Sequence, residues 1–399
     1  MIRYRAAWVL PPRRPPMEAG AVAVDRGRTV AVEAEPAGPC EDLGRVALLP
    51  GLVNAHVHLE LSWMRGRVPP AESMPAWADA LMALRRTVDA EPAAPMVEAI
   101  AQARASGTCL VGDITNTLAA CGPLLDGAMR ARVFRELLGF SAADPDALVS
   151  RAAAALERLP DGEWLRTSIV PHAPYSVSPG LLRAIARHGR GPISVHLGES
   201  AGEIEFLREG TGAWRALLER LGVWDGSWIP PRCGPVEYLD RMGLLSDRLV
   251  AVHGVQLTDA ELTRLAESGA TLVTCPRSNR WTGAGVPPIA RFYASGVRVA
   301  IGTDSLASVE DLNLFAELAE VRRLAPSVPA RRLLDSATQA GAEALGFGGE
   351  IATLTPGARA ALLAIRIPAG VTDVEEYLVN GIDPDAIDWI EEPGTNLEP

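Results

Sequence analysis

The chain has 399 residues and a formal net charge of −11, with 48% hydrophobic and 22% charged residues. This composition is typical of a globular protein, and the length suits one large domain with an accessory domain. The acidic charge argues against nonspecific binding to nucleic acids or anionic membranes, and no apolar run approaches the roughly 20 residues of a membrane-spanning helix.

The chain contains no lysine, so all 38 basic residues are arginine. A P-loop ATPase and a Schiff-base enzyme both need a lysine, so both are excluded. The five cysteines form no CxxC pair, and the proline-broken N-terminal segment AAWVLPPRRPP is too short for a signal peptide. These features predict a reducing, cytoplasmic location.

Short β-strands are predicted in residues 1–50, where GAVAVDRGRTVAV lies between glycine, proline and acidic turns. From residue 45 onward, apolar runs alternate with amphipathic stretches of helical length. The eight runs are RVALLPG, GTCLVGD, ARVFREL, LRTSIVPH, PISVHLGE, RLVAVHG, ATLVTCP and RVAIGTD. From about residue 350 the pattern becomes β-like again, in GEIATLTPGARAALLAIRI.

Alternating apolar strands and amphipathic helices indicate parallel β/α units. Eight such units predict an α/β fold with a (β/α)8, TIM-type barrel, here over residues 51–348. We expect residues 1–50 and 349–399, the two chain ends, to form a small β-sandwich domain beside it.

Five of the six histidines fall where predicted strands end, which is the catalytic face of such a barrel. Together with an aspartate after the eighth strand, they are His56, His58, His172, His196, His253 and Asp304. Strand residues i and i+2 point the same way, so the first two histidines can both face the barrel axis. A lone strand-end histidine is usually structural, but this concentration predicts a metal site. The sixth, His188, lies in a helical segment and is predicted on the surface.

Two competing metal motifs can be checked directly. His58 and Glu60 match the HxE half of the cytidine-deaminase signature, but its PCxxC half is absent. No HExxH occurs, which excludes zincin proteases. Glu60 is therefore expected to be a buried supporting carboxylate.

The motifs LLPGLVNAHVHLE, VHLGES, AVHG and IGTDS resemble the first, fifth, sixth and eighth strand motifs of the amidohydrolase superfamily, over nearly the whole chain. Many members bridge two metals with a carboxylated lysine, which this chain lacks; its fourth strand ends in VPHAPYSVS. The resemblance therefore implies the mononuclear deaminase branch, with one divalent zinc or iron ion. The implied ligands are His56, His58, His196 and Asp304.

The same resemblance implies roles for the residues around the metal. Glu199, in HxxE with His196, would be the acid that protonates a ring nitrogen. His253 would orient the attacking hydroxide, Asp304 would accept the proton of water, and His172 would contact the substrate. Glu199 could instead cap a helix that begins near ESAGEIEFL, and His253 could be a packed structural histidine.

A narrower set is similar to the aminodeoxyfutalosine deaminases of menaquinone biosynthesis: HLELS, HLGESAGEIEFLREGTGAWRALLERLGVW, CPRSN, GAGVPP and GTDSLAS. This resemblance implies hydrolysis of the adenine 6-amino group of aminodeoxyfutalosine, an adenosine with a carboxyphenyl ketone at its 5′ end. Near the C-terminus, PGARAALLAI lacks the charged pair of the usual PGKxADL, which affects only the expected local structure of the β-domain.

The benzoate of that substrate needs a cationic partner, and arginine offers a bidentate fork. Arg277 in CPRSN is the expected partner, and Ser278 and Asn279 could contact ribose or base. Trp77 could stack on the aromatic tail, although a core position on an amphipathic helix fits it as well.

Three further polar residues near predicted strand ends are open to interpretation. Arg135 and Glu136 could belong to the site or form an ion pair with each other. Asn116, in GDITNT, is placed near the site by position alone.

Other functions stay open at this stage. A deaminase of S-adenosylhomocysteine or methylthioadenosine shares the same motifs, and an imidazolonepropionase would lack the HxxE spacing. A noncatalytic assembly protein on this fold would have lost metal ligands that are all present here. We expect a small aminopurine nucleoside as the partner, and a homodimer is compatible with such barrels.

Overall fold

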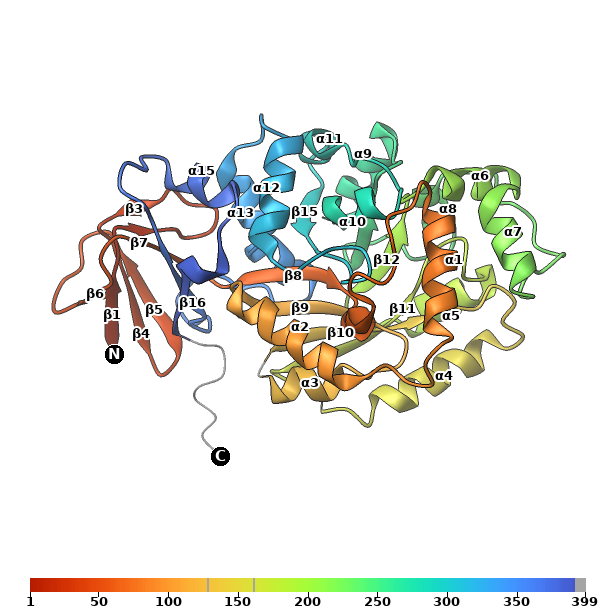
Figure 1. Ribbon diagram of the computed structural model, residues 1–399, viewed down its shortest axis with the longest axis horizontal. Coiled ribbons are helices and arrows are strands. Elements are labelled where there is room, and N and C mark those ends of the chain that lie inside the picture. The colour runs from red at the N-terminus through yellow and green to blue at the C-terminus, as the bar shows by residue number, and fades with distance from the viewer. Residues whose placement is uncertain (128, 161, 392–399) are drawn as a thin grey trace.

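The computed structural model describes residues 1–127, 129–160 and 162–391. Its central part consists of eight strands in two parallel four-stranded sheets, ordered β11-β10-β9-β8 and β12-β13-β14-β15 (Figure 1). These strands are β8 (Leu52–Val57), β9 (Thr108–Thr115), β10 (Arg130–Leu137), β11 (Leu165–Pro171), β12 (Ile193–Leu197), β13 (Leu249–His253), β14 (Thr271–Thr274) and β15 (Arg298–Ile301). The prediction of an α/β protein with eight parallel strands is confirmed.

The two sheets adjoin at both pairs of edges, where β11 contacts β12 and β15 contacts β8. Backbone hydrogen bonds cross both junctions: the His196 amide donates to the His172 carbonyl at 3.0 Å, and the Asp304 amide donates to the His56 carbonyl at 3.0 Å. Residues predicted at distant strand ends are therefore tied to one another through the backbone.

Helices lie between most of these strands, as the amphipathic stretches predict. They are α1 (Met74–Arg85), α2 (Ala93–Ala105), α3 (Cys121–Asp126), α4 (Pro145–Leu156), α5 (Pro179–His188), α6 (Ala201–Glu209), α7 (Gly212–Arg220), α8 (Pro235–Arg241), α9 (Asp259–Glu267), α10 (Pro276–Trp281), α11 (Ile289–Ala294), α12 (Leu314–Leu324), α13 (Ala330–Ser336), α14 (Gln339–Ala344) and α15 (Val374–Val379), with short 3-10 helices η1 (Leu59–Met64) and η2 (Pro384–Ala386). Local chemistry starts several of them: Asp144 and Ser178 accept from the third backbone amide of α4 and α5, and Thr258 forms a capping box with Glu261 at α9.

The first of the eight predicted runs is assigned wrongly. RVALLPG forms β7 (Val46–Pro50), which pairs with β16 (Leu362–Arg366) and β2 (Trp8–Val9) outside the eight-stranded unit. The first parallel strand is instead the next segment, β8. A glycine separates the two: a Cβ at Gly51 would lie 2.9 Å from the Cys109 sulfur, so only glycine fits where the chain passes between the sheets.

The strands from both chain ends lie together at one end of the molecule, on the left of Figure 1. They form two sheets, ordered β5-β4-β1-β6 and β17-β16-β7-β2-β3. The remaining bounds are β1 (Ile2–Arg5), β3 (Met17–Glu18), β4 (Ala21–Asp25), β5 (Arg28–Glu33), β6 (Glu41–Asp42) and β17 (Ile387–Glu391). One hydrophobic cluster contains residues of both sheets, among them Tyr4, Val22, Leu48 and Leu362.

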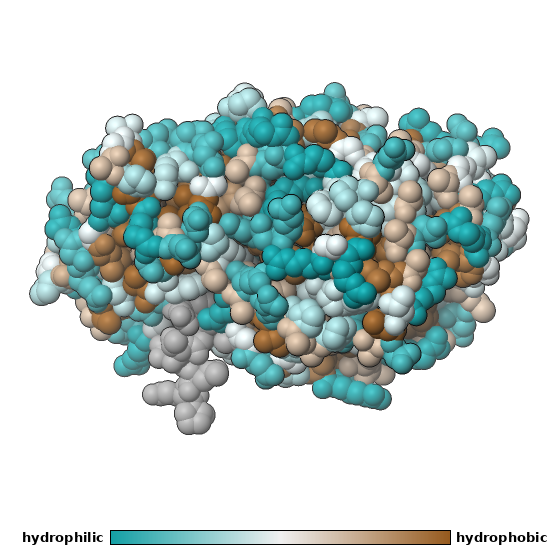
Figure 2. Space-filling view, in the orientation of Figure 1, coloured by the Kyte–Doolittle hydropathy of each residue, from teal (hydrophilic) through white to brown (hydrophobic). Residues whose placement is uncertain are grey.

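The central strands are buried on both faces, as parallel strands covered by helices must be; every residue of β8 and β9 is buried. On the surface, hydrophilic and hydrophobic side chains are interspersed across the face shown in Figure 2. Within the described residues, no helix is both long and apolar enough to cross a membrane.

Candidate active site

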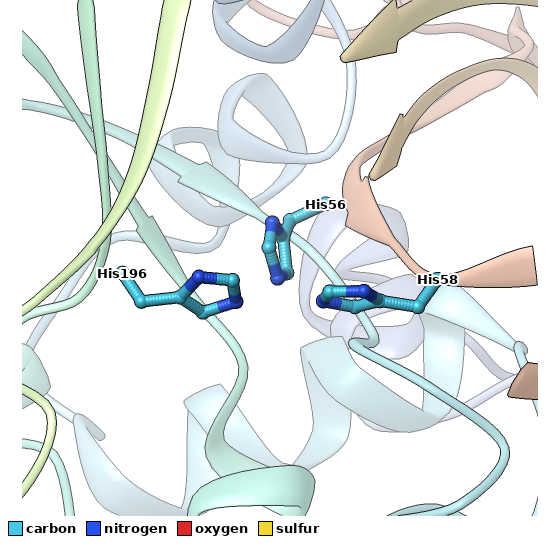
Figure 3. A group of neighbouring side chains, drawn as sticks. All are labelled: His56, His58 and His196. Carbon is cyan, nitrogen blue, oxygen red and sulfur yellow. The ribbon is translucent and has the colours of Figure 1, made fainter. Parts of the chain in front are cut away.

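Three histidines from opposite sheets converge at the carboxyl ends of the parallel strands (Figure 3). His56 lies in β8, His58 directly follows it, and His196 lies in β12. One nitrogen from each lies within 4.8 Å of the others, the geometry of a metal-binding group. The sequence prediction that these three side chains meet agrees with this geometry.

His56 and His196 each have a ring nitrogen available to coordinate a metal ion. Both ring nitrogens of His56 are buried without a hydrogen-bond partner in the described residues. The His196 Nδ1 donates to the His172 carbonyl at 3.0 Å, which leaves Nε2 unprotonated and available. Burial lowers the pKa of His56 and His58 well below its usual value and that of His196 to about 4, so all three are neutral ligands near pH 7.

Asp304, in the loop after β15, lies beside the three histidines, and these four residues are called the metal group here. Its Oδ1 lies 3.5 Å from His58 Nε2 and 4.0 Å from His56 Nε2. Burial raises the Asp304 pKa to about 6, although the Ser278 hydroxyl, which donates to its Oδ2 at 2.6 Å, favours the charged form. The backbone φ of Asp304 is 61°, a left-handed conformation that a non-glycine residue adopts only when the surrounding structure enforces it.

Glu199 and His253 lie next to the trio. Glu199 Oε2 is 3.5 Å from His253 Nε2, and both atoms are buried without a hydrogen bond among the described residues. The Asn279 amide nitrogen donates to His253 Nδ1 at 2.9 Å and to Glu199 Oε1 at 3.4 Å. Because Nδ1 accepts this bond, the proton of the neutral ring sits on Nε2, which becomes a donor.

The pKa of Glu199 is raised well above its usual value by burial, then by the negative charges of Asp304 and Glu203. Both effects favour the protonated form of the carboxyl group. The alternative of a helix cap does not apply, because Ser200 is the N-cap of α6 and accepts from the Glu203 amide. His253 has a φ of 78°, which places it, like Asp304, in a strained backbone conformation next to the metal group.

The fully buried Glu203 holds the backbone of Glu199 in place. Its two oxygens accept from the amides of Gly198 at 2.9 Å and Glu199 at 3.0 Å. Sequence reasoning missed this residue, although its position one helical turn after Glu199 puts it within reach of that backbone.

A cavity of about 1130 Å³ opens from the metal group. His58, His172, His196, Glu199 and Asp304 line its inner end. Its other walls are largely apolar: Leu81, Leu138, Phe140, Leu148, Leu217, Leu218, Leu221 and Val223. Tyr175 and Trp214, stacked at 3.8 Å between ring centroids, form an aromatic part of the wall. A polar metal end joined to a long apolar chamber suits a ligand with one polar and one apolar part.

Of the residues predicted to contact the substrate, some line the cavity and others do not. Trp77 is buried in a hydrophobic cluster and also lines the cavity. Within the described residues, the cavity wall does not include Arg277, Ser278 or Asn279. The Arg277 guanidinium, expected to read the substrate tail, pairs here with Asp311 at 2.9 Å and lies 3.8 Å from Glu317.

Ser278 and Asn279 are fully buried and hold Asp304, Glu199 and His253, so they support the site residues instead of lining the cavity. His188 is exposed at the end of α5, as predicted.

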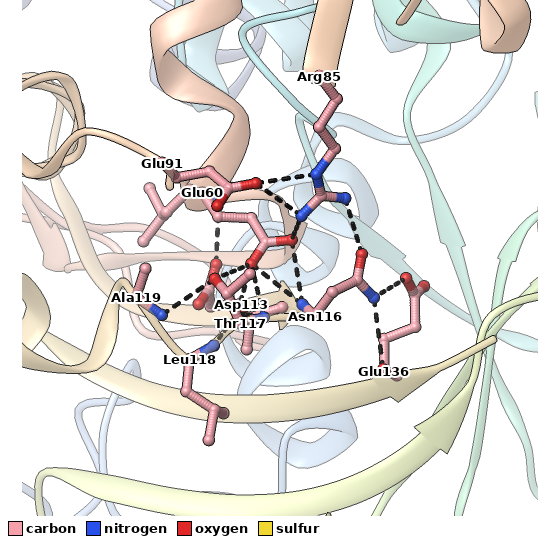
Figure 4. A network of polar contacts seen from close by, with 11 residues as sticks. Glu60, Arg85, Glu91, Asp113, Asn116, Thr117, Leu118, Ala119 and Glu136 are labelled. Carbon is pink, nitrogen blue, oxygen red and sulfur yellow. Dashed lines mark hydrogen bonds and ion pairs between the residues drawn. The ribbon is translucent and has the colours of Figure 1, made fainter. Parts of the chain in front are cut away.

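A polar network next to the trio was only partly foreseen (Figure 4). Glu60 is buried and accepts from Arg85 at 2.7 Å, as well as from Thr115 and Thr117. Asn116 and Glu136 both line the cavity, and an amide-to-carboxylate hydrogen bond of 2.8 Å joins them.

Comparison with known proteins adds an independent line of evidence. Residues 47–382 match the model of the amidohydrolase family. A 5-methylthioadenosine/S-adenosylhomocysteine deaminase of Syntrophobacter fumaroxidans is 31% identical, covering 87% of this chain and 80% of that protein. An aminodeoxyfutalosine deaminase of Deinococcus radiodurans is also 31% identical, covering 77% of this chain and 75% of that protein. A zinc-bound adenosine deaminase structure from Xanthomonas campestris is 28% identical, with a TM-score of 0.82 over 97% of this chain and 90% of that one.

Proposed function

The chain belongs to the amidohydrolase family, and from that premise we propose that it is a metal-dependent deaminase of an aminopurine nucleoside. The proposed reaction is hydrolysis of the adenine 6-amino group of aminodeoxyfutalosine, which yields futalosine and ammonia. The observation that carries the proposal is a buried Glu199 beside His253 and the histidine trio, all lining one cavity except the buried His56.

The donor set fits one divalent ion. Three neutral imidazoles and the Asp304 carboxylate are the ligand types that suit zinc or iron. Both nitrogens of the buried His56 have no hydrogen-bond partner among the described residues, as a metal-binding role for His56 would explain. When bound there, such an ion would lower the pKa of a water molecule to about 7 and supply hydroxide for hydrolysis. We propose zinc, in keeping with the zinc-bound adenosine deaminase to which the chain is similar.

The residues around the metal group supply the proton transfers. Glu199 donates its proton to N1 of the adenine ring, which makes C6 electrophilic. Asp304 accepts the proton of the attacking hydroxyl group and passes it to the departing amine, and the other proton of the water restores the Glu199 acid. His253 donates from Nε2 to the oxygen that attacks C6, since Asn279 fixes its tautomer. Ammonia leaves, and the ring becomes a hypoxanthine.

The apolar chamber supports a substrate with an aryl tail, and two exposed arginines line it. Arg86 donates to the Met82 carbonyl within its own helix. Arg151 lies on α4, and the nearby Asp144 is occupied as the N-cap of that helix. We propose that Arg151, in place of Arg277, pairs with the carboxylate of the substrate tail, because a guanidinium binds a carboxylate bidentately.

The test is steady-state deamination, followed by the ultraviolet change from adenine to hypoxanthine, on aminodeoxyfutalosine, S-adenosylhomocysteine, methylthioadenosine and adenosine. A preference of a hundredfold in kcat/KM for aminodeoxyfutalosine, about 2.7 kcal/mol of transition-state discrimination, is the expected result. Equal or faster turnover of the sulfur nucleosides would assign the activity named for the relative in Syntrophobacter fumaroxidans instead. No turnover of any of the four with metal bound would refute the proposed reaction.

We also propose that the two parallel sheets close into a (β/α)8 barrel over residues 51–348. The contacts of β11 with β12 and of β15 with β8 support closure. The hydrophobic cluster shared by the other two sheets supports a β-sandwich built from residues 1–50 and 349–399, of which 392–399 lie outside the described residues. A cytoplasmic location is proposed with this assignment.

A further inference from the structure

Glu136 is a buried carboxylate in the cavity wall that the proposed proton transfers do not use. It lies near the end of β10, is 5% exposed, and lines the cavity close to the trio. Its Oε2 accepts from the Asn116 amide at 2.8 Å, and its Oε1 lies 3.6 Å from His196 Nδ1. A separation of 3.6 Å is too long for a hydrogen bond, and that nitrogen already donates to the His172 carbonyl. The Glu136 Oε1 can therefore still accept a hydrogen bond from a ligand bound in the cavity.

The position of Glu136 is fixed by the network in Figure 4. Arg85 donates to the Asn116 Oδ1 at 2.9 Å, so the amide nitrogen of Asn116 must face Glu136. Arg85 is itself held by Glu60 at 2.7 Å and Glu91 at 2.8 Å. The network thus orients one Glu136 oxygen toward Asn116 and leaves the other available for a ligand.

His172 supplies a second acceptor beside it. The Ser176 hydroxyl donates to the Ala173 carbonyl at 3.2 Å, so toward His172 Nδ1, at 2.6 Å, it can only accept. The His172 proton is therefore on Nδ1, and Nε2 is an acceptor. One polar atom each from Glu136, His172 and His196 lies within 4.8 Å of the others.

This second group is a poor metal site. The His196 nitrogen nearest Glu136 is Nδ1, which carries a proton bonded to a carbonyl, whereas a metal ligand must be deprotonated. Two neighbouring acceptors in a cavity wall match two neighbouring hydroxyl donors, and the vicinal diol of a ribose is the part of a nucleoside that offers them.

We propose that Glu136 accepts a hydrogen bond from one ribose hydroxyl of the substrate and that His172 accepts from the adjacent hydroxyl. Glu136 is then a specificity-determining residue that selects ribonucleosides over deoxyribonucleosides. The inference rests on the proposed function, since it requires a nucleoside in this cavity.

The test compares adenosine, 2′-deoxyadenosine and 3′-deoxyadenosine as substrates of the metal-loaded wild type and of Glu136→Gln. In the variant, Asn116 fixes the glutamine oxygen, so its NH2 group faces the ribose and the acceptor is lost. The wild type should prefer adenosine over at least one deoxynucleoside by about 10- to 100-fold in kcat/KM, the range expected for one charge-assisted hydrogen bond. Glu136→Gln should reduce that ratio at least tenfold, with its metal content unchanged.

Glu98→Gln is the control, because it removes an exposed carboxylate, bonded to Gln102 at 2.8 Å, that belongs neither to this network nor to the cavity wall, and it should keep the wild-type ratio. A Glu136→Gln protein that loses activity equally on all three nucleosides, or that loses metal, would overturn the inference and make Glu136 a support for His196. If Glu136→Gln does not fold, Glu136→Asp is the second variant, because its shorter side chain moves the oxygen away from the ribose and keeps the charge. It should reduce the same ratio of adenosine to deoxynucleoside kcat/KM, and an unchanged ratio would overturn the inference. A wild type inactive on every adenine nucleoside would refute the proposed function itself.

Discussion

Replacing Glu203 with glutamine should separate the positioning of Glu199 from the stability of the fold. The Glu203 carboxylate is fully buried, and burial raises its pKa from 4.5 to about 7 even though two backbone amides donate to it. This rise in the Glu203 pKa means that folding disfavours the charged carboxylate by about 3 kcal/mol. Because the pKa of Glu203 is higher in the folded than in the unfolded protein, its protonated form adds stability below pH 4.5. That stability is lost as the pH rises through 7. The wild type therefore loses about 3 kcal/mol that Glu203→Gln, which does not titrate, keeps.

Although Glu203→Gln should be more stable than the wild type at neutral pH, it should be less active. In Glu203→Gln one oxygen can still accept an amide, but the new NH2 group faces the second N–H, so the backbone of Glu199 must shift. Misplacing a catalytic group by up to about 1 Å reduces kcat/KM by as much as about 100-fold. Loss of the Glu203 charge should also lower the pKa of Glu199, because that charge helps to raise it. The alkaline limb of the kcat profile should then move to lower pH.

The assay pairs urea unfolding from pH 4.5 to 8 with kcat and kcat/KM profiles over the accessible pH range, using metal-loaded proteins. Glu205→Gln is the control, because Glu205 is exposed on the same helix and accepts a hydrogen bond from the Thr211 hydroxyl at 2.8 Å. A difference in unfolding free energy that does not grow with pH would refute the raised Glu203 pKa. Wild-type kcat/KM with an unmoved alkaline limb would refute its role in placing Glu199.

Four other outcomes are expected. Glu199→Gln should lower kcat by about 10²- to 10⁴-fold and abolish the alkaline limb, because the acid is gone; an unchanged limb would assign it to another group. Chelation should abolish deamination and added zinc should restore it; activity that survives complete metal removal, checked by elemental analysis, would contradict the site. Gly302→Ala should weaken metal binding, measured by competition with a chromogenic chelator, because its Cβ would lie 2.8 Å from the Cβ of His56. Arg151→Met should raise KM for aminodeoxyfutalosine about 10- to 100-fold and change methylthioadenosine turnover much less; equal effects on both would rule out the tail contact.

The sequence by itself indicated most of the metal group. His56, His58, His196 and Asp304 could be found because a parallel α/β fold brings strand ends to one edge, so a local feature, a polar residue after an apolar run, predicts a shared location. Amphipathic spacing also indicated the helical stretches, since it depends on residues only a few positions apart. The one misassigned strand shows the limit of this reasoning. Both β7 and β8 are fully buried, and the sheet that each joins depends on pairing with residues distant in the sequence, β16 for β7 and β9 for β8.

The tertiary structure alone decided which side chains line the cavity. Arg277 follows a strand on the correct side, but carboxylates 34 and 40 residues further along the chain hold its guanidinium out of the cavity. Glu136 lines the cavity, and the orientation of its carboxylate depends on Asn116 and Arg85, which come from two other parts of the chain. Such orientations depend on hydrogen bonds between residues far apart in the chain. The hydrophobic periodicity of a single sequence reports local structure and does not predict those hydrogen bonds.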